Sequence, residues 1–140
     1  MIKHKFFSLA TALILLFSGA TAQAAGLEFK SYDQAVKEAE AEKKMIMVFF
    51  WADWCRFCVQ LRKDVFQNDK VKEAFDKSFV GVSVDVENPA DQELNKFRAS
   101  NALPTITFLK PDGEPYGYFD GATDPDTFIQ ILNMVLKGDS

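Results

Sequence analysis

The sequence has few of the side chains that usually bind metals or catalyse proton transfer. Its single histidine is His4, and its two cysteines are Cys55 and Cys58. Structural zinc sites use four nitrogen or sulfur ligands, so a zinc site here would need a second chain. Haem attachment needs a histidine directly after the second cysteine, where this chain has Val59. Thiol chemistry at Cys55 and Cys58 is therefore the main candidate, and Cu(I) carriage by two thiolates is a weaker alternative.

The sequence has only one long apolar run, and that run is too short for a comfortable membrane span. Residues 6–17 are apolar, follow Lys3 and Lys5, and precede small residues that end at Ala24. A span needs about 20 apolar residues, whereas this order is typical of a secretory signal peptide. We expect residues 1–24 to be cleaved and the mature chain to be periplasmic or secreted, without stable membrane insertion. An uncleaved anchor is the alternative.

Clustered basic charge is also missing. Without Lys3 and Lys5, residues 25–140 keep 14 basic and 20 acidic residues, a net charge of −6. Nucleic-acid-binding domains usually carry basic patches, so we expect no nucleic-acid partner. The segment has no repeat or linker and is expected to form one domain. Export to an oxidising compartment favours a cysteine pair that rests as, or cycles through, a disulfide.

Strand-like and helical patterns alternate along residues 25–140. Apolar runs and turn signals predict strands over residues 27–29, 45–50, 79–86, 105–109 and 115–119. Helical spacing and capping residues predict helices over residues 31–44, 55–66, 68–77, 88–100 and 124–138. The predicted caps are a capping box of Ser31 and Gln34, then Asn68 or Asp69, Asn88 and Asp124. In the fourth helix, Ala90, Leu94 and Phe97 are expected to face the core. The alternation predicts an α/β domain with a mostly parallel sheet, helices on both faces and an antiparallel closing hairpin.

The spacing of Cys55 and Cys58 favours a reactive pair over a structural staple. A disulfide here closes a four-residue loop, which constrains the unfolded chain very little. Both sulfurs face one side of the first turn of the predicted helix, and the helix N-terminus favours a thiolate at Cys55. We therefore predict that Cys55 attacks and that the more buried Cys58 resolves the mixed disulfide.

The residues around the pair are candidates for substrate binding. The apolar strand over residues 45–50 places Cys55 at the carboxyl end of a strand, where open α/β sheets hold their sites. Trp54 is expected to shield the nucleophile and provide a flat docking surface, with Arg56 and Phe57 as further substrate contacts. Core packing is the alternative for Trp54 and the first expectation for Trp51.

Two segments together resemble the thioredoxin family: FWADWCRFC (50–58) and ALPTITFL (102–109). The combination of W-x-x-W-C-x-x-C with a later L-P-T is specific. Residues 52–55, 66–71 and 121–128 also resemble the C-terminal domain of DsbD-type thiol:disulfide interchange proteins. The resemblance implies the thioredoxin fold, a central mixed sheet in the order β-α-β-α-β-α-β-β-α, with an extra short helix after the active-site helix.

The resemblance also implies roles for particular residues. Cys55 matches the nucleophilic cysteine and Cys58 the resolving one, so that their disulfide is the redox group and no other cofactor is expected. Pro104 matches the family's cis-proline, and Leu103 would offer backbone groups to a substrate strand. Gly121 matches a small residue beside the site. An ordinary strand-entry proline is the alternative for Pro104.

Three positions depart from the family pattern. Phe49 replaces a buried aspartate of thioredoxins, Arg62 replaces an acidic residue of the DsbD domain, and Arg56 replaces a glycine between the cysteines. Less negative and more positive charge favours the thiolate, which makes a disulfide more oxidising. We predict a reduction potential less negative than that of thioredoxin. Alternatively, both arginines are solvated charges with little effect.

The sequence therefore predicts an exported protein thiol–disulfide oxidoreductase that exchanges disulfides with client proteins. The resemblance favours a reductant that is itself re-reduced by a membrane-bound thiol–disulfide donor. An oxidase or isomerase of the same fold is the second interpretation. A redox-inert binding module with a permanent disulfide is the third.

Overall fold

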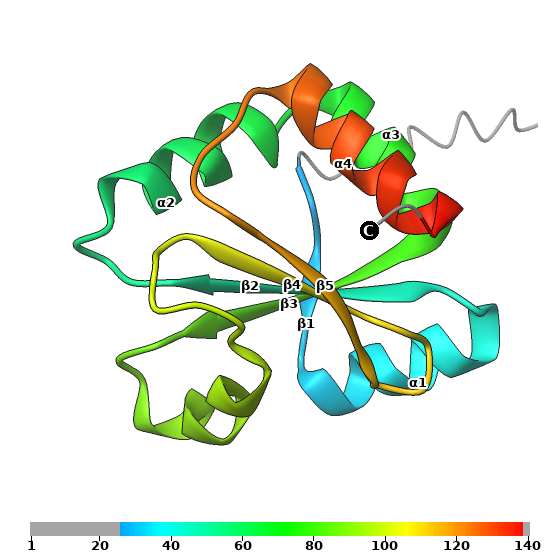
Figure 1. Ribbon diagram of the computed structural model, residues 1–140, viewed down its shortest axis with the longest axis horizontal. Helices are drawn as coiled ribbons and strands as arrows, with labels where there is room; N and C mark the ends of the chain where they lie inside the picture. The colour runs from blue at the N-terminus through cyan, green and yellow to red at the C-terminus, as the bar shows by residue number, and fades with distance from the viewer. Residues whose placement is uncertain (1–25, 139–140) are drawn as a thin grey trace, which may run out of the picture.

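The computed structural model describes residues 26–138, which form one sheet with helices on both faces (Figure 1). The predicted signal peptide, residues 1–24, lies outside the described residues. The strands are β1 Phe29–Lys30, β2 Met45–Trp51, β3 Phe79–Asp85, β4 Thr105–Leu109 and β5 Pro115–Asp120. The helices are α1 Tyr32–Glu42, α2 Arg56–Gln60, the π-helical turn η1 Leu61–Val65, α3 Asp69–Ser78, the 3-10 helix η2 Pro89–Phe97 and α4 Pro125–Lys137.

The sheet is mixed and has the strand order β1-β3-β2-β4-β5. The first three strands in this order are parallel, whereas β4 is antiparallel to β2 and β5 is antiparallel to β4. The mixed sheet implied by the family resemblance and the antiparallel closing hairpin are confirmed. The expectation of a mostly parallel sheet is wrong at one pairing, because β4 is antiparallel to β2. For β4 to be parallel to β3, the connection between them would have to return to the opposite end of the sheet. The segment after β3 stays at the end where β2 and β3 finish, so β4 begins there, with Thr105 opposite Phe50.

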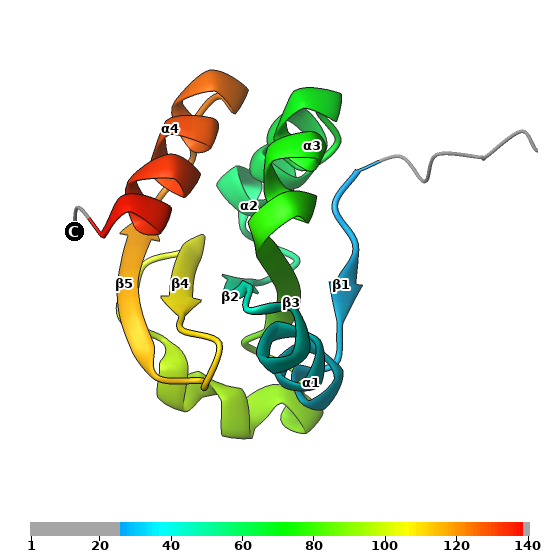
Figure 2. The same ribbon diagram turned by 90° about the vertical axis from the view of Figure 1, so that its right-hand side faces the viewer.

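The sheet separates two apolar cores (Figure 2). Met47 and Phe49 face the layer of α2, α3 and α4, while Ile46, Val48 and Phe50 face α1 and η2. Successive side chains of a strand point to opposite faces, and β2 is buried on both. The continuous apolar run in the sequence is therefore the signature of this central strand.

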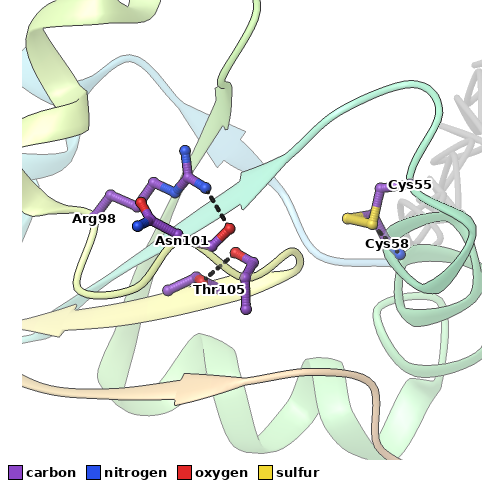
Figure 3. Close-up of a disulfide and its surroundings, with 6 residues drawn as sticks. Cys55, Cys58, Arg98, Asn101 and Thr105 are labelled. Atoms are coloured by element: carbon purple, nitrogen blue, oxygen red, sulfur yellow. Dashed lines mark hydrogen bonds between the residues drawn. A yellow bond between two sulfur atoms is a disulfide. The ribbon is translucent and has the colours of Figure 1, made fainter.

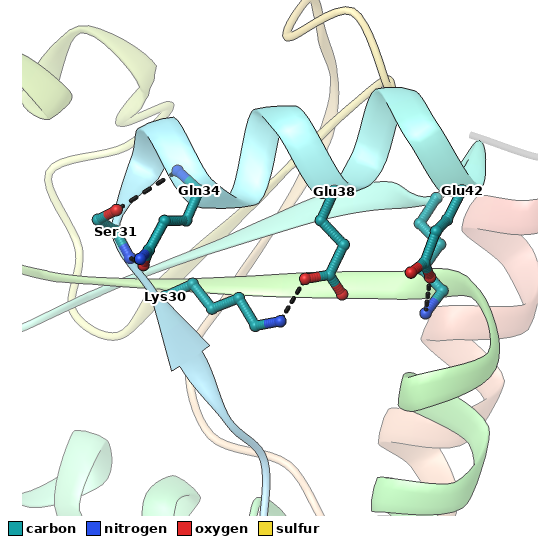
Figure 4. A network of polar contacts seen from close by, with 6 residues as sticks. Lys30, Ser31, Gln34, Glu38 and Glu42 are labelled. Atoms are coloured by element: carbon teal, nitrogen blue, oxygen red, sulfur yellow. Dashed lines mark hydrogen bonds and ion pairs between the residues drawn. The ribbon is translucent and has the colours of Figure 1, made fainter.

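Polar contacts join α1 to the edge of the sheet (Figure 4). The predicted capping box is present, because Ser31 and Gln34 each accept a hydrogen bond from the other's backbone N–H at 3.4 Å. Lys30 of β1 forms an ion pair with Glu38 of α1. The hydrogen bond to Glu38 is the main cause that raises the pKa of Lys30. The capping box begins α1, and the ion pair joins the short edge strand β1 to that helix.

Most predicted helix boundaries are confirmed, but the segment over residues 88–100 differs from the prediction. Asn88 caps η2 as expected. However, Ala90 is exposed, and Leu94 and Phe97 are only half-buried. A 3-10 helix has three residues per turn, so Leu94 and Phe97 align while Ala90, four residues before Leu94, does not. Asp124 and Gly138 bound α4 as predicted, and Gly138 has a φ of 79°.

Candidate active site

Cys55 and Cys58 form a disulfide directly beyond the carboxyl end of β2. Cys55 is the N-cap of α2, and its backbone N–H donates to the carbonyl of Ala52 at 3.1 Å. Its Sγ accepts a hydrogen bond from the backbone N–H of Cys58 at 3.1 Å. The first N–H groups of a helix have no partner within the helix, so they can stabilise negative charge on a sulfur at the N-cap.

The two sulfurs differ in their exposure to solvent. Cys55 is 5% exposed, whereas Cys58 is completely buried. Cys58 packs in the core beneath the α2 and η1 turns together with Leu61 and Val65. The predicted order of burial is confirmed, and only the first cysteine of the pair keeps a surface that another protein could reach.

The two tryptophans before the pair have opposite environments. Trp51 is half-buried, and its indole N–H donates to Oγ of Ser83 at 2.8 Å. Trp54 is 68% exposed, and its indole N–H donates to Oε1 of Glu87 at 2.9 Å. Core packing is thus excluded for Trp54. The hydrogen bond to Glu87 holds the exposed ring at the surface beside Cys55.

The residues between and after the cysteines add to this exposed surface. Phe57 is 57% exposed, Val59 is 54% exposed and Arg56 is also exposed. Large apolar side chains that are exposed close together often mark a binding site. The structure therefore leaves all three predicted contact residues of this segment, Trp54, Arg56 and Phe57, open to a partner.

Phe49 belongs to the same buried core as Cys58, and Arg62 lies over its ring; we call this buried side the inner side of the pair. Phe49 is fully buried, and its ring meets that of Phe66 edge-on at a centroid distance of 5.0 Å. The guanidinium carbon of Arg62 lies 4.1 Å from the ring centroid of Trp51 and 5.8 Å from that of Phe49. Within residues 26–138, no carboxylate forms an ion pair with Arg62. Arg62 is therefore a half-buried cation on aromatic rings, whereas Arg56 is an exposed charge.

The loop before β4 reaches the same end of the sheet as the disulfide, because β4 is antiparallel to β2. The Leu103–Pro104 peptide bond is cis, as the family resemblance implied. The carbonyl of Pro104 accepts a hydrogen bond from the N–H of Gly121 at 2.9 Å. Gly121 has a φ of 92°, a conformation that favours glycine. The structure thus brings Pro104 and Gly121 together, with Leu103 half-buried beside them.

Three polar residues of this region were missed in the sequence. Arg98 donates to two carbonyls of the loop before Pro104, Thr105 donates to a third, and Glu87 holds Trp54 (Figure 3 shows Arg98 and Thr105 with the disulfide). No motif identifies them, because a polar side chain that binds a backbone carbonyl leaves no fixed spacing in the sequence. Only the antiparallel placement of β4 brings these contacts to the end of the sheet at which the cysteines lie.

Other kinds of site receive no support from the part of the chain that the structure describes. Across residues 26–138, no group of three or more histidine, cysteine, aspartate or glutamate side chains is arranged to hold a metal ion. The helices of the same residues are too short or too polar to cross a membrane.

Comparisons with known proteins agree with the geometry of the site. The model of the thioredoxin-like domain family matches residues 32–136. The chain belongs to the thioredoxin-like family. Among solved structures, a thioredoxin from Thermus thermophilus is 28% identical with a TM-score of 0.70, over 82% of this chain and 91% of that one. The reduced C-terminal domain of DsbD from Neisseria meningitidis is 25% identical with a TM-score of 0.59, over 73% of this chain and 91% of that one.

A curated relative is similar over part of its length. The thiol:disulfide interchange protein DsbD of Vibrio cholerae is 36% identical over 83 residues, which are 58% of this chain and 14% of that protein. The chain thus matches only a small part of the length of this relative. Family membership and the C-x-x-C disulfide make this protein a thioredoxin-like thiol–disulfide oxidoreductase, and the recognition of the thioredoxin fold from sequence is confirmed.

Proposed function

We propose that the protein reduces disulfides in exported client proteins, with Cys55 as the nucleophile and Cys58 as the resolving cysteine. The observation that carries the proposal is the unequal burial of the two sulfurs within one helical turn. A client can approach only the partly exposed Cys55. The buried Cys58 can reach Cys55 but not a second client.

The proposed reaction conserves atoms and electrons. In the reduced protein, the Cys55 thiolate attacks a client disulfide, which forms a mixed disulfide and releases one client sulfur as a thiolate. Phe49 supplies no carboxylate near the pair, so this client thiolate can accept the proton of Cys58. The Cys58 thiolate then attacks Sγ of Cys55 and restores the disulfide of the structure. The second client sulfur leaves, and its protonation completes the transfer of two electrons to the client.

The exposed side chains beside Cys55, those of Trp54, Arg56 and Phe57, form a rim on which a client docks in this proposal. Trp54 and Phe57 offer flat apolar area beside Cys55, and aromatic side chains are frequent anchors of protein interfaces. Leu103, next to Pro104, would pair its backbone with an extended client segment. Arg56 adds a positive charge at the edge of the rim.

The location and the electron donor are part of the same proposal. The signal-peptide pattern of residues 1–24 supports export to the periplasm or beyond. Similarity to the DsbD relative, named as a thiol:disulfide interchange protein, supports a place in a thiol–disulfide relay. We propose that a membrane-bound dithiol protein re-reduces the Cys55–Cys58 disulfide after each client.

Reduction of insulin in the presence of dithiothreitol tests the chemistry. The wild-type protein should accelerate insulin precipitation, and Cys55→Ser should remove the acceleration. Gln60→Ser changes an exposed side chain of the same helix, α2, and serves as a matched control that should keep most of the activity. A wild-type protein without activity would instead support a binding module with a permanent disulfide. Full activity of Cys55→Ser would refute the assignment of the nucleophile.

An oxidase or isomerase is the second candidate, and one observation favours it. The pair has a fully buried phenylalanine and a half-buried arginine on its inner side, at Phe49 and Arg62. Positive charge without a nearby carboxylate favours the thiolate and so the reduced pair. Equilibration of Cys55–Cys58 with glutathione buffers discriminates the candidates. A potential near that of thioredoxin, about −270 mV, favours the reductant, and one near about −120 mV favours the oxidase.

A further inference from the structure

The loop between η2 and β4 is held from within by side chains that bind three consecutive carbonyls. Arg98 Nε donates to the carbonyl of Ser100 and Arg98 Nη2 to that of Asn101, both at 2.8 Å. Thr105 Oγ1 lies 2.7 Å from the carbonyl oxygen of Ala102 and 2.8 Å from Oδ1 of Asp120, so its single proton is shared between these two acceptors. Figure 3 shows these side chains directed at the loop backbone. Arg98 and Thr105 thus hold the loop from its two ends, and Ser100 Oγ adds a contact within it by accepting the N–H of Ala102 at 3.1 Å.

These contacts single out Leu103 as the residue whose backbone remains available. On the other side of Leu103, the carbonyl of Pro104 accepts the N–H of Gly121. Within residues 26–138, no hydrogen bond engages the N–H or the carbonyl of Leu103. Arg98, Thr105 and Gly121 thus occupy the carbonyls on both sides of Leu103 and leave its own polar groups for another chain.

We propose that Arg98 is a positioning residue for client binding, which fixes the loop so that Leu103 meets an extended segment of a protein client. The inference rests on the proposed function, because it concerns the docking step that precedes attack by Cys55. Arg98 itself touches neither the sulfurs nor the client. Because Arg98 already orders the loop in the free protein, client binding loses less conformational entropy and the affinity for the client is higher.

The chemistry of the contact explains why an arginine is needed. The planar guanidinium presents several N–H donors in a fixed fork, so one side chain can bind two neighbouring carbonyls at once. A lysine has a flexible point charge and cannot reproduce the fork. The contact with the carbonyl of Ser100 is partly buried, so this carbonyl would lose its partner without gaining full hydration, whereas the contact with Asn101 is exposed.

The test compares a protein disulfide with a small one. Arg98→Gln and Arg98→Lys are assayed with insulin and with hydroxyethyl disulfide, which has no peptide backbone to pair with Leu103. We expect kcat/KM for insulin to fall about tenfold through a higher KM, as for the loss of a well-formed hydrogen-bonded contact. Turnover of hydroxyethyl disulfide and the reduction potential should stay unchanged. Lys96→Gln removes an exposed cation of η2 that contacts the ring of Phe97 and should affect neither substrate.

The outcomes separate this inference from the proposed function. A wild-type protein that reduces neither disulfide would refute the proposed function. A wild-type protein active on both, with Arg98→Gln equally active on insulin, would refute the positioning role alone. An equal loss on both substrates would also refute it, because it would indicate a general structural role. Should Arg98→Gln not fold, Arg98→Lys keeps the charge and most of the packing. Its activity on insulin relative to hydroxyethyl disulfide then decides.

Discussion

The inner and outer sides of the disulfide differ in how far their side chains are exposed to solvent. On the inner side, Phe49 is fully buried and Arg62 is stacked on Trp51. On the outer side, Trp54 and Phe57 are more than half exposed. Buried groups act on the stability of the fold and on the relative energies of thiol, thiolate and disulfide. Exposed groups act on the partner, so redox potential and client choice should respond to different mutations.

The largest effect is expected where the two sides meet, at Cys58. In Cys58→Ser, Cys55 can still attack a client, but no second sulfur can release it. Multiple turnover of insulin should fall to background, and a mixed disulfide with the client should accumulate. Non-reducing gel electrophoresis and mass spectrometry measure this covalent product.

The matched variant for this prediction is Cys55→Ser, which should form no covalent product at all. The two variants should differ in covalent trapping because Cys58 is buried and cannot reach a client. Equal trapping by the two variants would mean that both sulfurs reach clients. The assignment of separate roles would then be wrong.

The second largest effect concerns stability on the inner side. Phe49→Ala empties a fully buried site that contacts the rings of Phe29 and Phe66. The free energy of unfolding should fall by about 3–5 kcal/mol. Trp54→Ala, on the exposed side, should change it by less than about 0.5 kcal/mol. Urea denaturation of the oxidised proteins measures both, and similar losses would contradict the division of the two sides.

Sequence patterns predicted the features that depend on neighbouring residues better than those that depend on the arrangement of the whole sheet. The apolar run of β2 and the caps Ser31, Asn68 and Asp124 follow local rules, and the structure confirms them. The orientation of β4 depends on the path of η2 along the sheet, which residue spacing does not encode. The contacts of Arg98 depend in turn on that orientation, so they became visible only in three dimensions.

An intermediate effect is expected for the charge on the inner side. Arg62→Gln removes a half-buried cation that has no ion-pair partner among residues 26–138. If this cation stabilises the thiolate tenfold, its loss makes the reduction potential about 30 mV more negative. Lys63→Gln, which removes an exposed cation of the same turn, should leave the potential nearly unchanged because solvent screens it. Equilibration with glutathione measures both variants. An unchanged potential in Arg62→Gln would mean that the charge of Arg62 does not stabilise the thiolate.

The smallest effect is expected for the hydrogen bond that holds the outer ring. Glu87→Ala removes the acceptor of the Trp54 indole N–H, while Glu87→Gln keeps an oxygen acceptor in the same place. Loss of one exposed hydrogen bond should raise KM for insulin about threefold in Glu87→Ala, with Glu87→Gln close to wild type. The potential should not change in either variant, because Glu87 is exposed and its contact is with the outer ring. A shift in potential without a change in KM would mean that Trp54 acts on the sulfurs rather than on the client, and the two sides of the disulfide would then be coupled.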